Sequence, residues 1–124
     1  MASRLTEIFV FGSNLQGRHG KGAAKEAINK WGAIYGIASG RQGNSYAIPT
    51  KSSPWQTLPR HKIVHYVNEF LKYAYEHPDL KFILTPIGCG LAGYSYAEIA
   101  PMFWLAPENV IIPEEFKPYL STQT

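Results

Sequence analysis

Two apolar runs in this sequence each lead into a glycine-rich loop that a helical pattern follows. The first run, residues 8–11, precedes four glycines between residues 12 and 22, and alanines at helical spacing come next. The second run, residues 82–87, precedes Gly88, Gly90 and Gly93. Glycine lets a backbone turn sharply and expose its N–H groups, and a helix N-terminus attracts anions. The sequence therefore predicts two strand–loop–helix units that together can hold a diphosphate.

Hydrophobic periodicity predicts an α/β order for the whole chain. Strands are expected at residues 7–11, 46–50, 81–87 and 109–112. Helices are expected at residues 21–31, at residues 59–76 and from about residue 96, where Ser95 and Glu98 have capping-box spacing. Pro101 is expected to kink the last helix or delay its start. Loops are expected at residues 36–44 and 51–58, and an exposed tail follows the last strand.

This order predicts one three-layer α/β/α domain, residues 1–124, with a mainly parallel central sheet. A length of 124 residues and a hydrophobic content of 45% suit one core. Ligands of such sheets bind at the carboxyl ends of the strands, so both glycine-rich loops are expected at one cleft.

The charge distribution favours a small anionic ligand. Residues 1–68 carry nine Lys/Arg against two Asp/Glu, and residues 69–124 carry three against seven, within a net charge of +3. The basic half contains the first glycine-rich loop. Its basic residues are scattered singly, whereas nucleic-acid sites are usually clustered, so nucleic acid is an unfavoured partner.

Composition also bears on compartment and cofactors. The single cysteine, Cys89, excludes an intramolecular disulfide, and the N-terminus has no apolar segment typical of a signal peptide. No apolar run approaches the roughly 20 residues of a membrane helix. We therefore expect a cytoplasmic protein that does not enter membranes. No residue spacing predicts a metal site, and no cofactor is expected.

The two glycine-rich loops resemble those of the macro domain, whose better-studied members bind ADP-ribose and related nucleotides. Residues 13–17 and the following glycines match the family's asparagine-bearing segment and loop, and the resemblance places Asn14 at the distal ribose. Residues 90–94, Gly-Leu-Ala-Gly-Tyr, match the Gly-aliphatic-x-Gly-aromatic loop that wraps the diphosphate. The resemblance implies a macro-domain-like fold that binds ADP-ribose or an NAD-derived nucleotide.

The chain departs from the family in two respects. Many members carry an early aspartate that binds adenine, and this chain offers only Glu7, inside the first strand. The outer strands of the family are also largely missing. The chain is thus similar to the reduced, phage- or bacterium-borne versions of the fold, whose ligand need not be ADP-ribose itself.

The candidate ligand-binding residues come from the two loops. The first loop contributes Asn14, Gly17, Arg18, His19, Gly20, Lys21 and Gly22. The second contributes Gly88, Cys89, Gly90, Leu91, Ala92, Gly93 and Tyr94. The first set is not a Gly-x-Gly-x-x-Gly fingerprint, so a dinucleotide dehydrogenase is not expected. Cys89 is interpreted as a packing residue, with an activated thiol as the alternative.

Three functions remain open from the sequence. Binding of an ADP-ribose-like nucleotide is favoured over hydrolysis of an ADP-ribose derivative, because neither loop contains Asp or Glu to activate water. Only His19 and Glu98 are candidates for that catalytic role, and His19 is alternatively a ligand donor or a solvated side chain. A nucleic-acid-binding accessory protein is the third alternative. Four aromatic residues in or beside loops are candidates for stacking on a planar ring: Tyr35, Tyr46, Trp55 and Tyr94.

Overall fold

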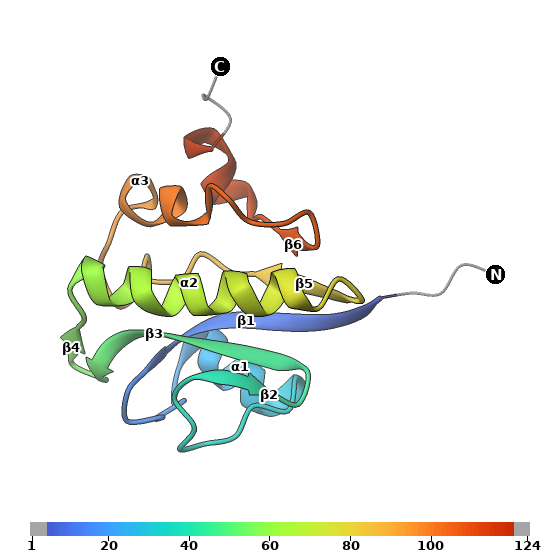
Figure 1. Ribbon diagram of the computed structural model, residues 1–124. Coiled ribbons are helices and arrows are strands. Elements are labelled where there is room, and N and C mark those ends of the chain that lie inside the picture. The colour runs from blue at the N-terminus through green and yellow to red at the C-terminus, as the bar shows by residue number, and fades with distance from the viewer. Residues whose placement is uncertain (1–4, 121–124) are drawn as a thin grey trace.

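A computed structural model describes residues 5–120, which form a mixed α/β fold around one sheet (Figure 1). The strands are β1 (Thr6–Asn14), β2 (Gly40–Gln42), β3 (Ser45–Ser53), β4 (Gln56–Thr57), β5 (Leu80–Leu84) and β6 (Val110–Ile111). Their order in the sheet is β2-β3-β1-β5-β6, and β4 pairs with β3. Strands β3, β1, β5 and β6 are parallel, while β2 and β4 are antiparallel to β3. The prediction of an α/β fold with a mainly parallel sheet is confirmed.

The helical segments are α1 (Gly22–Lys30), α2 (Arg60–Glu76), α3 (Tyr96–Ile99) and the 3₁₀ turns η1 (Ala100–Phe103) and η2 (Glu114–Tyr119). The expected helix start at residue 96 is confirmed, because Ser95 and Glu98 form a capping box. Pro101 lies at the beginning of η1, so the helix ends at Ile99 and continues as a 3₁₀ turn, and its start is not delayed. Among residues 5–120, none of the helices has both the length and the apolar character that a membrane crossing requires.

Strand β1 separates two apolar clusters because successive side chains of a strand point to opposite faces. Ile8 and Val10 belong to the larger cluster, which includes the buried face of α2. Phe9 and Phe11 belong to the smaller cluster, to which α1 contributes Ala24 and Ala27. The fully buried aliphatic and aromatic side chains of β1 hold the central strand between these clusters.

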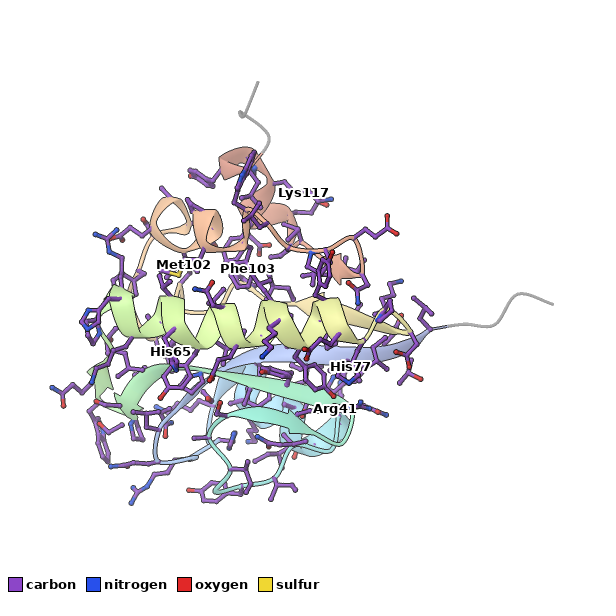
Figure 2. The ribbon with its side chains drawn as sticks, in the orientation of Figure 1. Arg41, His65, His77, Met102, Phe103 and Lys117 are labelled. Atoms are coloured by element: carbon purple, nitrogen blue, oxygen red, sulfur yellow. The ribbon has the colours of Figure 1, made fainter. Side chains whose placement is uncertain are left out.

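The C-terminal segment, residues 100–120, packs back onto α2. The ring of Phe103 lies 6.4 Å from that of Phe70 in α2 and 5.8 Å from that of Phe116 in η2, measured between centroids. Figure 2 shows Met102 and Phe103 directed from this segment toward α2. Phe116 is completely buried, so the prediction that an exposed tail follows the last strand is wrong for this part of it. A single phenylalanine in a polar stretch has no periodicity that could have shown this.

Two predicted loops contain short strands. Residues 40–42 pair with residues 45–47 as a hairpin, and residues 56–57 pair with the end of β3. Both segments have the glycine or proline content of a loop, and their pairing to β3 decides their conformation. In β2, Arg41 (Figure 2) bonds to α2, because its Nη1 donates to the Tyr73 hydroxyl at 3.3 Å.

Parallel pairing brings the ends of three strands together at one edge of the sheet. Strand β1 is central, with β3 on one side and β5 on the other. Asn14 at the end of β1 lies opposite Lys51 of β3, and the Leu15 N–H donates to the Lys51 carbonyl at 2.8 Å. The segments that leave β1, β3 and β5 therefore meet, and they enclose the candidate site.

Candidate functional site

A cavity of about 940 Å³ lies at the carboxyl ends of β1, β3 and β5. This volume is at the upper end of the range typical of small-molecule sites, roughly 300–1,000 Å³. Four segments line it: residues 12–24, Tyr35, residues 50–55 and residues 85–96, each in part. Both glycine-rich loops thus face one cavity. The predicted site residues that line it are Asn14, Arg18, Gly20, Lys21, Gly22, Gly88, Cys89, Gly90, Leu91 and Ala92.

Asn14 organises the first loop, residues 12–22, from within. Its Oδ1 accepts from the N–H groups of Gln16 and Arg18, each at 3.1 Å, and its Nδ2 donates to the Arg18 carbonyl at 2.9 Å. The side chain is almost completely buried. Three of its four hydrogen-bonding positions are occupied within the loop, which leaves one Nδ2 hydrogen for a ligand. Asn14 therefore shapes the cavity wall in addition to any contact with a ribose.

Gly17 is a buried residue of the first loop and does not line the cavity. Its φ is +69°, and a Cβ there would stand 2.4 Å from the Gly36 carbonyl carbon. The Gly36 N–H donates to the Gly17 carbonyl at 2.8 Å, which joins the first loop to the segment after α1. Glycine is required at this position by backbone conformation and by close packing, not by the approach of a ligand.

His19 is also buried under the loop, with 3% of its surface exposed. Its Nδ1 lies 2.8 Å from the Gly17 carbonyl, and its ring packs edge-on against Phe11 and Tyr35. Its Nε2 finds no hydrogen-bond partner among residues 5–120. Burial lowers the pKa of this imidazole below its ordinary value, which favours the neutral ring. The residue does not line the cavity, in contrast to the solvated or ligand-facing side chain expected from a glycine-rich loop.

Positive charge surrounds the cavity. Arg18, Lys21 and Lys51 line it, and none of them is in a salt bridge within residues 5–120. Gly22, Ala23 and Ala24 present the first turn of α1, which has neither a side-chain cap nor an acidic residue. Among the described lining residues there is no Asp or Glu. This combination of cations and a helix N-terminus favours an anion.

The second loop, residues 88–94, is tied down at its ends and open in its middle. The Tyr94 N–H donates to the Gly88 carbonyl at 2.9 Å, and the Tyr94 hydroxyl donates to the Leu58 carbonyl at 2.7 Å. Gly93 and Tyr94 therefore support the loop and do not line the cavity. A Cβ at Gly90 would meet no atom within 4 Å. Gly90 and the exposed Leu91 form the accessible part of the wall.

Cys89 lines the cavity with its thiol half-buried. Burial, with a smaller contribution from the Glu98 carboxylate, raises its pKa to about 11. The thiol is therefore protonated at neutral pH, and its Sγ donates weakly to the Ile87 carbonyl at 3.4 Å. The interpretation of Cys89 as a packing residue agrees with this environment.

Glu98 stands outside the cavity and caps α3. Its Oε1 accepts from the Ser95 N–H at 2.9 Å and from the Ser95 hydroxyl at 3.0 Å. These hydrogen bonds, and to a smaller extent Arg60, lower the pKa of the carboxyl group. The two candidates for water activation, Glu98 and His19, thus both lie away from the cavity lining.

The hairpin of β3 and β4 contributes lining residues that the sequence did not predict. Thr50, Lys51 and Pro54 line the cavity together with Trp55, which was expected only as a possible stacking residue. The available signal was Lys51 and Trp55 on either side of Pro54, immediately after a β-prone run.

A second, smaller hollow of about 410 Å³ lies between α2 and the C-terminal segment. Its lining includes Leu71, Tyr75 and Trp104, and none of the predicted site residues.

Comparison with protein-family models, with curated proteins and with solved structures yields no match to this chain. Interpretation of the site therefore depends on its geometry and on the loop motifs.

Proposed function

We propose that this protein binds ADP-ribose or a related NAD-derived nucleotide in the 940 Å³ cavity, within a three-layer, macro-domain-like arrangement. The observation that carries the proposal is that both glycine-rich loops line one cavity together with Arg18, Lys21 and Lys51, with no carboxylate among the described lining residues. A diphosphate placed between the loops would meet backbone N–H groups and uncompensated positive charge.

Each loop has a separate role in this proposal. The open wall at Gly90 and Leu91 lets a diphosphate approach the backbone closely, and the first turn of α1 faces the distal part of the ligand. Asn14 contributes its remaining Nδ2 hydrogen to the distal ribose. Capture of a nucleotide in this way would remove it from solution by mass action.

Binding is favoured over hydrolysis for a chemical reason. Water activation needs a base near the ligand, and the two candidates, His19 and Glu98, do not line the cavity. Cys89 does line it, but its raised pKa makes it a poor nucleophile at neutral pH.

Isothermal titration calorimetry with ADP-ribose, cyclic ADP-ribose and amino-acid-conjugated ADP-ribose tests the proposal. We expect saturable binding of at least one of these compounds. Absence of binding up to millimolar ligand would contradict it. Incubation with ADP-ribosylated protein and with ADP-ribose 1″-phosphate tests the alternative, and release of ADP-ribose or phosphate would establish hydrolysis.

A further inference from the structure

Trp55 is the most conspicuous exposed side chain at the cavity. The residue is 81% exposed, compared with 48% for Trp104, which lies outside the cavity. Of the four aromatic residues expected near loops, only Tyr35 and Trp55 line the cavity; Tyr46 is in the core and Tyr94 holds the second loop. A large ring left open at a cavity forgoes the stabilisation of burial and is available to stack on a ligand.

The backbone that carries Trp55 is held in place by specific hydrogen bonds. Trp55 N–H donates to the Ser53 hydroxyl at 3.3 Å, and Lys51 Nζ donates to the carbonyl of Pro54. The Thr57 hydroxyl donates to the Ala92 carbonyl at 2.8 Å and so joins the hairpin to the second loop. The exposed indole therefore projects from a hydrogen-bonded turn that is joined to the second loop.

A lysine of the same hairpin also lines the cavity. Lys51 contacts the carbonyl of Pro54, the residue immediately before Trp55, and both Lys51 and Trp55 line the cavity. A nucleotide likewise carries its negative phosphate one sugar away from its planar base. The hairpin thus presents a cation and an aromatic face in the combination that a nucleotide requires.

Several polar side chains of the cavity donate hydrogen bonds within the protein, and the other polar side chains of the lining include the three cations and two tyrosines. The hydroxyls of Ser13, Thr50 and Thr85 donate to the carbonyls of Ala38, Ser13 and Val10, and Asn14 Nδ2 donates to Arg18. No lining Asp or Glu occurs among the described residues. Discrimination between bases requires directed donors and acceptors, whereas stacking accepts any aromatic base.

We propose that Trp55 is the platform on which the nucleobase stacks, and that the site therefore accepts nucleoside diphosphate sugars with purine or pyrimidine bases alike. This inference rests on the proposed function, because it assigns the base end of the same ligand. Tyr35 and Tyr96 are the competing platforms, because both line the cavity. The Tyr35 ring lies edge-on to the buried His19, and the Tyr96 ring lies edge-on to Phe116.

Calorimetric titrations of wild type, Trp55→Ala, Trp55→Phe, Trp104→Ala, Tyr35→Ala and Tyr96→Ala test the inference. The ligands are ADP-ribose, ADP-glucose, GDP-glucose, UDP-glucose and, as a base-free probe, inorganic pyrophosphate. We expect the affinities of wild type for ADP-glucose, GDP-glucose and UDP-glucose to lie within about tenfold of one another. Trp55→Ala should lower the affinity for each of them by roughly tenfold or more. Trp55→Phe should recover most of the loss, Trp104→Ala should behave as wild type, and pyrophosphate affinity should not change.

Tryptophan fluorescence provides a second readout. Nucleotide sugars should quench the emission of wild type and of Trp104→Phe, and this response should disappear in Trp55→Phe. Three results would overturn the stacking role: equal nucleotide affinity in wild type and Trp55→Ala, an equal loss for pyrophosphate, or a loss confined to Tyr35→Ala or Tyr96→Ala. A preference of more than about a hundredfold for one base would overturn the predicted tolerance.

The titrations also separate this inference from the proposed function. If wild type and Trp55→Ala bind ADP-ribose equally, the inference fails and the proposed function stands. If the nucleotide sugars bind through Trp55 but ADP-ribose does not bind, the proposed function fails and the stacking role stands. If no nucleotide binds, both fail.

Discussion

The two glycine-rich loops face one cavity but are built differently. The first loop is held internally by Asn14, by the close approach of Gly17 to Gly36 and by the buried ring of His19. The second loop is anchored by Tyr94 and joined to the hairpin by Thr57, while Gly90 has open space around it. Similar composition therefore has two uses: Gly17 permits tight packing in the first loop, and Gly90 leaves space for a ligand in the second. Substitutions that remove the internal contacts of Gly17 or Asn14 should affect folding, and a side chain added at Gly90 should affect binding.

The largest expected effect is that of Gly17→Ala on stability. A Cβ at this position meets the Gly36 backbone and must adopt a positive φ, so we expect a loss of about 2–4 kcal/mol in the free energy of unfolding. Denaturant titration followed by circular dichroism measures it. Gly20→Ala is the matched control, because a Cβ there meets nothing within 4 Å. Equal stability of the two variants would contradict the packing role of Gly17.

Asn14→Ala should also act on folding. The substitution leaves the N–H groups of Gln16 and Arg18 and the Arg18 carbonyl without their side-chain partner. We expect a loss of about 1–3 kcal/mol in the same unfolding measurement. The exposed neighbour Gln16 provides the control, since Gln16→Ala removes none of these bonds. A variant that retained wild-type stability would show that water replaces the asparagine without cost.

Gly90→Val should affect binding and leave folding nearly unchanged. The added side chain enters the open space where a diphosphate would approach the backbone, so ADP-ribose affinity should fall at least tenfold, about 1.4 kcal/mol. Calorimetry and a thermal melt measure the two quantities. Gly93→Val is a less clean test because Gly93 has a φ of +86°, so the substitution strains the backbone as well. Ser39→Val places the same valine side chain on an exposed loop outside the cavity and serves as control.

If Gly90→Val binds ADP-ribose as tightly as wild type, the diphosphate does not lie against the second loop. The second loop would then be open without binding the ligand, and the proposed functional difference between the two loops would be wrong.

Arg18→Ala and Lys21→Ala should have the smallest effects. Both side chains line the cavity, but exposed charges attract an anion more than they fix its position. We expect each to weaken binding by less than about tenfold at low ionic strength, and the difference from wild type to shrink as salt is added. Lys25→Ala, on the exposed part of α1 outside the cavity, is the control. A large, salt-independent loss would place the phosphate groups on these side chains instead of on the backbone.

Local sequence was sufficient to predict the main elements because periodicity is a local property. Residues 8–11 are buried in β1, the face of α2 at Ile63, Val67 and Phe70 is buried as expected, and the Ser95–Glu98 spacing forms its cap. The short strands β2 and β4 could not be predicted, because each depends on pairing with β3 and has little propensity of its own.

The sequence by itself determined that two strand–loop–helix units would bring glycine-rich loops and positive charge to one edge of a mainly parallel sheet. Only the tertiary structure decided which residues face the cavity. Gly17 and His19 are turned beneath the first loop and Glu98 caps α3, whereas Lys51 and Trp55 reach the cavity from a predicted loop. The reason is the register of β3 with β1, which places Lys51 opposite Asn14, 37 positions earlier in the chain. Contacts between residues so far apart in the sequence depend on strand pairing, which local sequence patterns do not predict.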